Sequence, residues 1–250
     1  MKEEGKKEKR SIRIRQIFAL LCLAGFLGSG SRLLPCALEY GQGAKEYRNL
    51  NVMVREYGAR KGERTAGEKE EIPESYLRKI NPDYICWLRI PGTAVDYPVA
   101  GSSRPGYYLN HTFQGNPNSC GSLFVQEDIK RLENGNTVIF GHNRKDGTMF
   151  ADLKNYRSAD FYKNHPIIRI YYGRKWREGV IFSCQLRGEE DLEYCRTGFS
   201  DEAEKQGFIN EMKEASLYPI PFNPPVNGPL ITLSTCYGRT KRMIVQAVLM

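Results

Sequence analysis

GPLITLSTCYGRTKRMIVQAVLM, residues 228–250, closes the chain with two apolar runs on either side of a short turn. This pattern predicts two neighbouring β-strands. Side chains alternate along a strand, so one face of the first run carries Ile231 and Leu233. The opposite face carries Leu230, Thr232, Ser234 and Cys236. Cys236 therefore ends an apolar strand in line with two hydroxyl groups, a position that a buried structural cysteine does not need.

The second run predicts where the nearest cations point. The face made of Met243, Val245, Ala247 and Leu249 is wholly apolar and is expected to meet the core. Arg242 points the opposite way, towards the polar side of the neighbouring strand, whereas Arg239 lies in the turn and has no defined phase. A guanidinium near a thiol favours the thiolate and can hold an oxyanion during acyl transfer. The pattern indicates a reactive cysteine with Arg242 beside it.

A cysteine nucleophile also needs an acid/base partner, and the chain has three histidines. His142 ends the apolar run TVIFGH and is followed by the turn-rich NRKDGTMF, a strand-end position typical of site residues. His111 lies in a loop with many hydrogen-bonding neighbours, and His165 opens a strand as an edge or capping residue. Position therefore favours His142.

The globular part is predicted to start near Ile72 and to be mostly β. Short β-rich runs alternate with turn signals, including YICWLRIPGTAVDYPV, NTVIFGH, PIIRIYYG and EGVIFSCQL. Their number and spacing predict a β-barrel or a sandwich. One helix interrupts the strands after Ser200, which is expected to cap it, and its apolar stripe through Phe208 and Met212 is expected to pack on the sheet without a chemical role.

The formal charge of +8 would suggest nucleic acid or a membrane surface as partner if it were evenly spread. Residues 1–16 hold seven Lys/Arg and three Asp/Glu, a net charge of +4, so half of the excess lies in a basic tail. The apolar segment 17–38 follows, and this order predicts a membrane-targeting element with the tail in the cytoplasm and the rest outside. The length favours a retained anchor over a cleaved signal. A nucleic-acid partner is not expected. Residues 39–71 are predicted to form a polar spacer or helix before the domain at 72–250.

The seven cysteines stand singly, without the spacing of a metal site. They predict neither a metal, nor a cofactor, nor a dense disulfide framework, although a bridge from Cys184 to Cys195 remains an alternative.

Several of these motifs together resemble a known family. TLSTC at 232–236, GHN at 141–143 followed by DGTMFADL, and the terminal KRMIVQAVL resemble the sortases, the cysteine transpeptidases of Gram-positive cell surfaces. DYICWLRIPGTAVDYPV and YYLNHTFQGNPNSCGSLF are similar to class B in particular. The resemblance covers roughly 72–250. It departs from the family in Cys86, where a glycine is common, and in a shorter turn after Cys236.

The resemblance implies a closed sortase-type β-barrel with a few peripheral helices. It implies Cys236 as nucleophile, His142 as acid/base and Arg242 as the arginine of the site, with Arg239 as the alternative because of the short turn. The substrate-binding positions it implies are Leu109, Asn143, Ser234 and Thr235.

The implied reaction cleaves an NP-x-T-like sorting motif after threonine and joins the acyl group to an amine of a peptidoglycan precursor or of a pilin. The protein would thus anchor surface proteins from a single-pass position in the cell membrane, with its catalytic domain outside. Two other readings remain: a membrane-tethered β-domain that binds peptide or wall polymer without catalysis, and a papain-type protease, which the C-terminal position of Cys236 disfavours.

Overall fold

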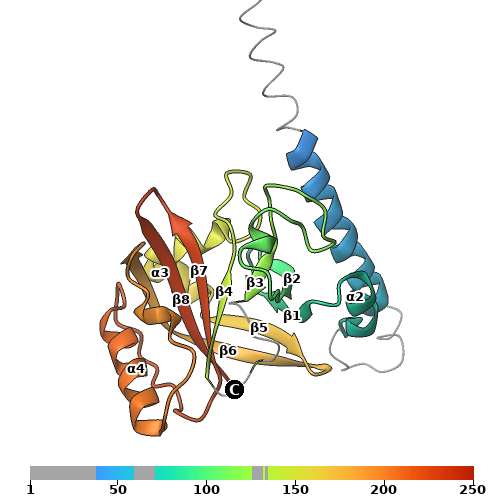
Figure 1. The fold of residues 1–250 in the computed structure, drawn as a ribbon. Coiled ribbons are helices and arrows are strands. Elements are labelled where there is room, and N and C mark those ends of the chain that lie inside the picture. The colour runs from blue at the N-terminus through green and yellow to red at the C-terminus, as the bar shows by residue number, and fades with distance from the viewer. Residues whose placement is uncertain (1–37, 59–70, 126–131, 133–134) are drawn as a thin grey trace, which may run out of the picture. The chain divides into compact units, whose positions relative to one another are not determined.

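A computed structural model describes residues 38–58, 71–125, 132 and 135–250 of the chain. Eight strands form a closed barrel in the order β1-β2-β3-β4-β7-β8-β6-β5, and β5 pairs back onto β1 (Figure 1). Their bounds are β1 (Tyr84–Arg89), β2 (Asp96–Ala100), β3 (Leu123–Val125), β4 (Asn136–Phe140), β5 (Ile167–Tyr172), β6 (Lys175–Gly188), β7 (Leu230–Tyr237) and β8 (Lys241–Leu249). The predicted mostly-β barrel is confirmed, and the sandwich alternative is wrong.

Helices are few and lie around the barrel. Besides the helix at residues 38–58, the described α-helices are α2 (Glu74–Ile80), α3 (Ala159–Asn164) and α4 (Glu202–Glu214), and the 3₁₀ turns are η1 (Tyr107–Leu109), η2 (Ala151–Arg157) and η3 (Glu193–Cys195). The helix after β6 begins one residue later than predicted, because the Asp201 carboxylate accepts the Glu204 amide at 2.8 Å and so caps it. Ser200 is not the cap; its amide and hydroxyl both donate to the Glu204 carboxylate.

Two parallel strand pairs interrupt the antiparallel order of the barrel. β2 pairs with β3, and β4 pairs with β7 over five residues from Asn136 opposite Leu230 to Phe140 opposite Ser234. Parallel strands present their carboxyl ends at the same edge of a sheet. The residues that follow Phe140 and Ser234 therefore leave the sheet side by side.

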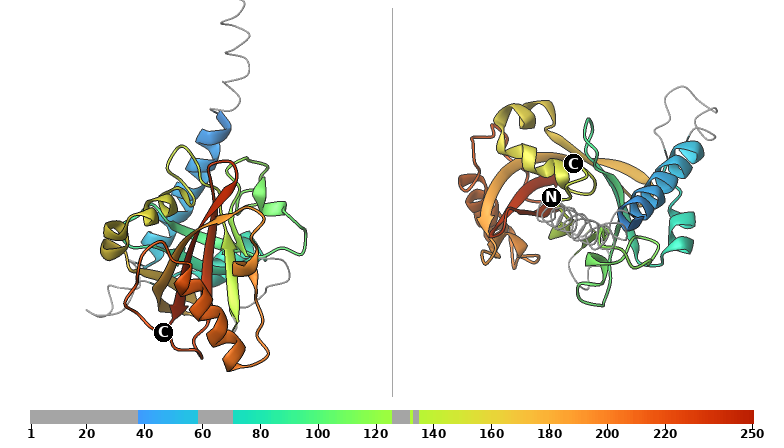
Figure 2. Two further views of the ribbon diagram at one scale, coloured as in Figure 1. Left: turned by 90° about the vertical axis from the view of Figure 1, so that its left-hand side faces the viewer. Right: turned by 90° about the horizontal axis from the view of Figure 1, so that it is seen from above.

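The alternation predicted for β8 is borne out by its packing. Met243, Val245, Ala247 and Leu249 belong to the main barrel core, whereas Ile244 and Val248 belong to a second apolar cluster on the other face of the strand. Helix α4 supplies Phe208, Ile209 and Met212 to this second cluster, and Figure 2 shows α4 lying against the outer side of β7 and β8. Burying each such side chain contributes about 1.5–3 kcal/mol, which fixes α4 on that face.

A buried polar chain crosses the three central strands on the α4 side. The Thr232 hydroxyl donates to Asn136 Oδ1 at 2.7 Å and accepts from Gln246 Nε2 at 3.1 Å. Asn136 Nδ2 in turn donates to the backbone oxygens of Tyr194 and Arg196, both at 2.9 Å. Because buried polar atoms are costly when unpaired, this chain specifies the register of β4, β7 and β8.

Residues 38–58 are helical, and from Gly43 onwards they belong to the same compact unit as the barrel. Tyr47, Leu50 and Val54 are buried in the main core, so this part of the predicted spacer packs onto the domain. The basic tail and residues 17–37 of the predicted membrane segment lie outside the described residues. Among those that are described, no helix combines the length and the apolar character that crossing a bilayer requires.

Candidate active site

Cys236 and Arg242 stand directly opposite each other on neighbouring strands. The antiparallel pairing of β7 with β8 sets Cys236 against Arg242 and Tyr237 against Lys241. Cys236 is exposed, and the Arg242 side chain is about a quarter exposed, with one carboxylate, Glu189, at 3.9 Å. Arg239 lies exposed in the turn between the strands. The short turn therefore leaves Arg242 in the register that the strand alternation predicts.

His142 reaches the same edge through the parallel pair of β4 and β7. Beyond the last paired residues, the Gly141 amide donates to the Ser234 oxygen at 3.2 Å and the Thr235 hydroxyl donates to the Gly141 oxygen at 2.7 Å. One residue after His142, Asn143 Nδ2 donates to the backbone oxygen of Cys236 at 2.9 Å. These bonds extend the alignment of the two chains, so His142 leaves its strand at the level of Cys236.

The orientation of the His142 ring is set by the connection between β2 and β3. His142 Nε2 lies 2.8 Å from the backbone oxygen of Leu109. A carbonyl oxygen can only accept, so Nε2 carries a hydrogen in this contact and Nδ1 is the nitrogen left to exchange a proton. Gly121, whose φ is +60, leaves room for this arrangement, because a Cβ there would lie 2.8 Å from the Leu109 oxygen and 3.1 Å from the His142 ring.

The 3₁₀ turn η3 packs against β7 just before Cys236. The Tyr194 hydroxyl lies 3.3 Å from Ser234 Oγ. Burial raises the pKa of Tyr194 to about 12, while the bond with Ser234 and the charge of Arg242 oppose the rise. Burial also raises the pKa of the Cys195 thiol, against the influence of Tyr194 and Arg242. The Arg242 charge therefore also acts on two residues of η3, Tyr194 and Cys195.

Cys236 differs from the other cysteines that the structure describes. Burial raises the pKa of Cys86, and it raises that of Cys184 to about 12, so neither is suited to act as a thiolate. The alternative bridge between Cys184 and Cys195 is absent, since both are free. Cys184 belongs to the barrel interior and Cys195 packs against the outer cluster, so the barrel wall lies between them.

The four predicted substrate-binding residues differ in how exposed they are. Leu109 is 42% exposed and meets His142 through its backbone oxygen, whereas Asn143 is partly exposed and meets the Cys236 oxygen through its side chain. Ser234 and Thr235 are buried, and their hydroxyls meet Tyr194 and Gly141. As successive residues of β7, they point to opposite faces of the strand.

The other two histidines have structural partners. His111 stacks on Tyr107 and bonds its backbone oxygen at 2.8 Å through Nδ1. His165 bonds the oxygen of Pro91 at 2.9 Å. Both contacts fit the preference for His142. No group of three or more His, Cys, Asp or Glu side chains within the described ranges could hold a metal ion.

Sequence reasoning missed the network that orders the loop after His142. Asp146 accepts from the Arg144 guanidinium, at 2.8 Å from Nη2, and from the Thr148 amide and hydroxyl. Partial burial opposes ionisation, but these bonds lower the pKa of Asp146 to about 2. The only signal in the sequence is the turn-forming DGT at 146–148, which gives no hint that a nearly buried arginine completes the network.

The comparisons with known proteins agree with this geometry. A model of the sortase domain matches residues 88–250. The chain belongs to the sortase family. Sortase B of Staphylococcus aureus is 30% identical over 244 residues, which cover 95% of each chain, and sortase B of Listeria monocytogenes is 34% identical over 180 residues, 69% of this chain and 72% of that protein.

Solved sortase structures share the fold. A Staphylococcus aureus sortase B–substrate complex superimposes with a TM-score of 0.74 at 29% identity, covering 85% of this chain and 98% of that one. Clostridium perfringens sortase B gives a TM-score of 0.67 at 30% identity, covering 71% and 99%. The protein is therefore a class B sortase, a cysteine transpeptidase that anchors surface proteins, and the non-catalytic and papain-type readings are set aside.

Replacing Gly121 with alanine tests the support of His142. The new Cβ would lie within 2.8 Å of the Leu109 oxygen and 2.6 Å of the Tyr108 oxygen, so the carbonyl that holds the ring has to move. We expect G121A to lose the hydrogen bond at His142 Nε2, seen by NMR of the labelled ring as faster exchange of its hydrogen with water.

The matched control is Gly173→Ala. Its φ is +61, close to the +60 of Gly121, but nothing lies within 4 Å of the added Cβ. It carries the same backbone strain without the collision. An unchanged His142 resonance in G121A, or an equal change in G173A, contradicts the assignment of Gly121 as the support of the ring.

Proposed function

We propose that Cys236 is the nucleophile of this sortase, that His142 is its acid/base and that Arg242 holds the oxyanion. The observation that carries the proposal is the joint register of three strands. β4 and β7 run parallel and bring His142 to the level of Cys236, while β8 sets Arg242 opposite the same cysteine. Cys236 is also the exposed thiol among the described cysteines, which a nucleophile requires.

In the first half of the reaction, the Cys236 thiolate attacks the carbonyl carbon of a threonine in the substrate. The carbonyl oxygen gains negative charge, and the Arg242 guanidinium stabilises it with donors that are already in place. His142 gives its Nδ1 proton to the departing amine as the C–N bond breaks. A thioester between Cys236 and the threonine remains.

In the second half, an incoming amine attacks the thioester. It transfers a proton to His142, its nitrogen bonds to the threonine carbonyl carbon, and the C–S bond breaks to restore the thiolate. One peptide bond is thus exchanged for another amide bond, without a metal or a redox partner in the atom balance.

The substrate proposed is a surface protein with an NP-x-T-like sorting motif, and the acceptor is an amine of a peptidoglycan precursor or of a pilin. A pocket of about 380 Å³ beside the end of β4 supports an extended peptide at this place; it is lined by Arg104, Tyr107, Phe124 and Phe140, among others. Leu109 and Asn143 contact His142 and Cys236 respectively, and Ser234 and Thr235 are the buried residues that precede Cys236 on β7.

The cellular placement proposed is a single pass through the cell membrane by residues 17–38, with residues 1–16 in the cytoplasm and the barrel outside. The charge order of the sequence supports it, because a basic tail before an apolar segment is retained on the cytoplasmic side. An outside barrel places Cys236 where exported proteins and wall precursors meet it.

Substitution of the two arginines by lysine tests the oxyanion role. A guanidinium gives two parallel hydrogen bonds that an ammonium cannot reproduce, so R242K keeps the charge but is expected to lower kcat/KM by about 10-fold to 10³-fold, the scale of losing one oxyanion donor. R239K is the control, since Arg239 is an exposed turn residue, and it should match the parent. Kinetics on a panel of NP-x-T peptides measure both. If R239K loses kcat/KM while R242K keeps the value of the parent enzyme, the oxyanion role belongs to Arg239.

Protease added to intact protoplasts tests the placement. The barrel domain should be removed from the outside while the basic tail stays protected, as followed by antibodies against each end. Protection of the Cys236 domain would reverse the orientation and contradict the wall-anchoring placement.

A further inference from the structure

We propose that Tyr47, in the helix at residues 38–58, is a positioning residue for His142. Tyr47 lies outside residues 88–250, which the sortase domain model matches. The inference rests on the proposed role of His142 as acid/base and extends the active-site support to a helix that the sequence marks only as a spacer.

The Tyr47 hydroxyl joins two points of the loop that holds His142. It donates to the Gly121 oxygen at 2.7 Å and accepts from the Phe113 amide at 3.0 Å. The residue is 5% exposed, and burial raises the pKa of Tyr47 well above its usual range, so the hydroxyl stays protonated and keeps donating. Gly121 lies next to both the His142 ring and the Leu109 oxygen, since a Cβ added there would come within 3.1 Å of the ring and 2.8 Å of the oxygen. One hydroxyl thus anchors the backbone directly behind the histidine.

Tyr47 also reaches the loop that follows His142, through the ring of Tyr97 on β2. The two rings meet edge to face with centroids 5.4 Å apart, and the Tyr97 hydroxyl accepts from the Met149 amide at 3.3 Å. Met149 has a φ of +56 and bridges back to Asn143, and the next amide, of Phe150, donates to the His142 oxygen at 3.0 Å. The strained backbone at Met149 needs such an external anchor.

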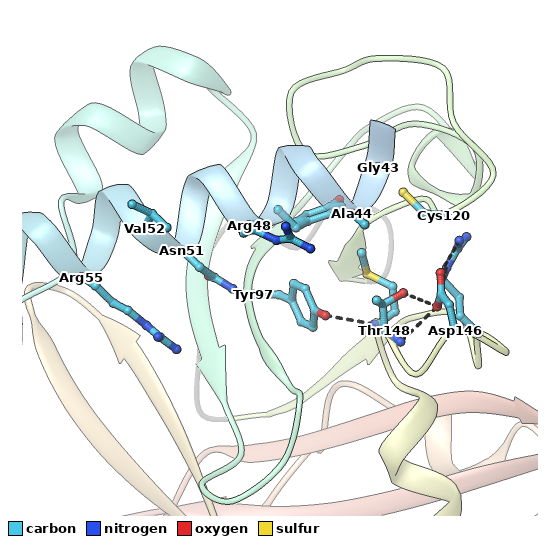
Figure 3. A pocket seen from close by; sticks show the side chains of 13 residues that line it. Gly43, Ala44, Arg48, Asn51, Val52, Arg55, Tyr97, Cys120, Asp146 and Thr148 are labelled. Carbon is cyan, nitrogen blue, oxygen red and sulfur yellow. Dashed lines mark hydrogen bonds and ion pairs between the residues drawn. The ribbon is translucent and has the colours of Figure 1, made fainter. Parts of the chain in front are cut away.

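A pocket of about 310 Å³ shows why these contacts matter. It opens between the helix, from Gly43 to Arg55, and the loop from Arg144 to Met149 (Figure 3). Figure 3 shows Tyr97 lying across this space and directed towards Thr148. The helix and the loop are therefore not in continuous contact there, and the tyrosine pair connects them. Tyr47 takes part in both connections to the His142 region, through its hydroxyl bonded to Gly121 and through its ring packed on Tyr97.

Tyr47→Phe is the test, because it removes the hydroxyl and keeps the ring that packs on Tyr97. Assays use the full-length protein with two substrates: a sorting peptide with its amide bond, and the same peptide acid as an activated ester. Expulsion of an amine needs the proton from His142, whereas an activated phenolate leaves without one. We expect Y47F to lower the amide rate about 10-fold, the scale of a small misplacement of a catalytic group, and to change the ester rate by less than about 2-fold.

Tyr156→Phe is the matched control. Tyr156 is also buried, and its hydroxyl also donates to a backbone oxygen, that of His165, at 2.8 Å, so Y156F loses a donated bond of the same kind away from His142. Thermal unfolding should show similar losses of stability in the two variants, while Y156F keeps both rates. Labelled-ring NMR should show faster exchange of the His142 Nε2 hydrogen in Y47F alone. Parent-like amide turnover in Y47F, or an equal fall with both substrates, overturns the proposal.

Two further variants complete the design. His142→Ala should lose amide turnover while retaining more of the ester reaction; if it keeps full amide turnover, the proposed role of His142 fails, whatever Y47F does. If Y47F does not fold, Tyr97→Phe removes only the bond to Met149 and must show the same bias against the amide substrate. An equal loss with both substrates in Y97F contradicts the inference.

Discussion

The parallel pairing of β4 with β7 is the constraint on which the site depends. It aligns Phe140 with Ser234, and the bonds beyond that pair carry His142 to the level of Cys236. Parallel neighbours cannot be joined by a tight turn, so nearly a hundred residues separate the two groups in the chain. Those residues include β5, β6 and α4, while the Asn136–Thr232–Gln246 chain holds β4, β7 and β8 in register.

Strand β8 brings the charge of Arg242 next to Cys236 and leaves the thiol exposed. Because β8 is antiparallel to β7, Arg242 comes back opposite Cys236 after a short turn, while its neighbours Met243 and Ile244 are buried on opposite faces. The apolar side chains on both sides of β8 fix the phase of Arg242. The strand end thus combines an exposed thiol with a guanidinium whose position is set by packing, in line with the roles proposed for both groups.

Alternation in the last two strands was enough to predict the faces of Cys236 and Arg242, because the period of a strand is two whatever the fold around it. His142 was predicted from its place at the end of an apolar run. The sequence could not reveal the contacts of Leu109, Gly121 and Tyr47 with the region of His142, because they join segments far apart in the chain and have no local periodic signal. Residues 43–58 looked like part of a polar spacer since few of their large apolar side chains, chiefly Tyr47, Leu50 and Val54, are buried in the core. The Cys184–Cys195 bridge failed for a similar reason, as spacing alone does not say on which side of the barrel wall each thiol lies.

The central claim is that the strand-end geometry makes Cys236 the acyl carrier. Its most direct test is to mix the full-length protein with an NP-x-T peptide in the absence of an acceptor amine, quench in acid, digest, and map the adduct by mass spectrometry. The account predicts a thioester between the threonine carboxyl group and Cys236, and its loss when a nucleophilic amine is added before the quench. An acyl group mapped to Cys195 or to another cysteine, in an enzyme that turns over the peptide, would contradict it.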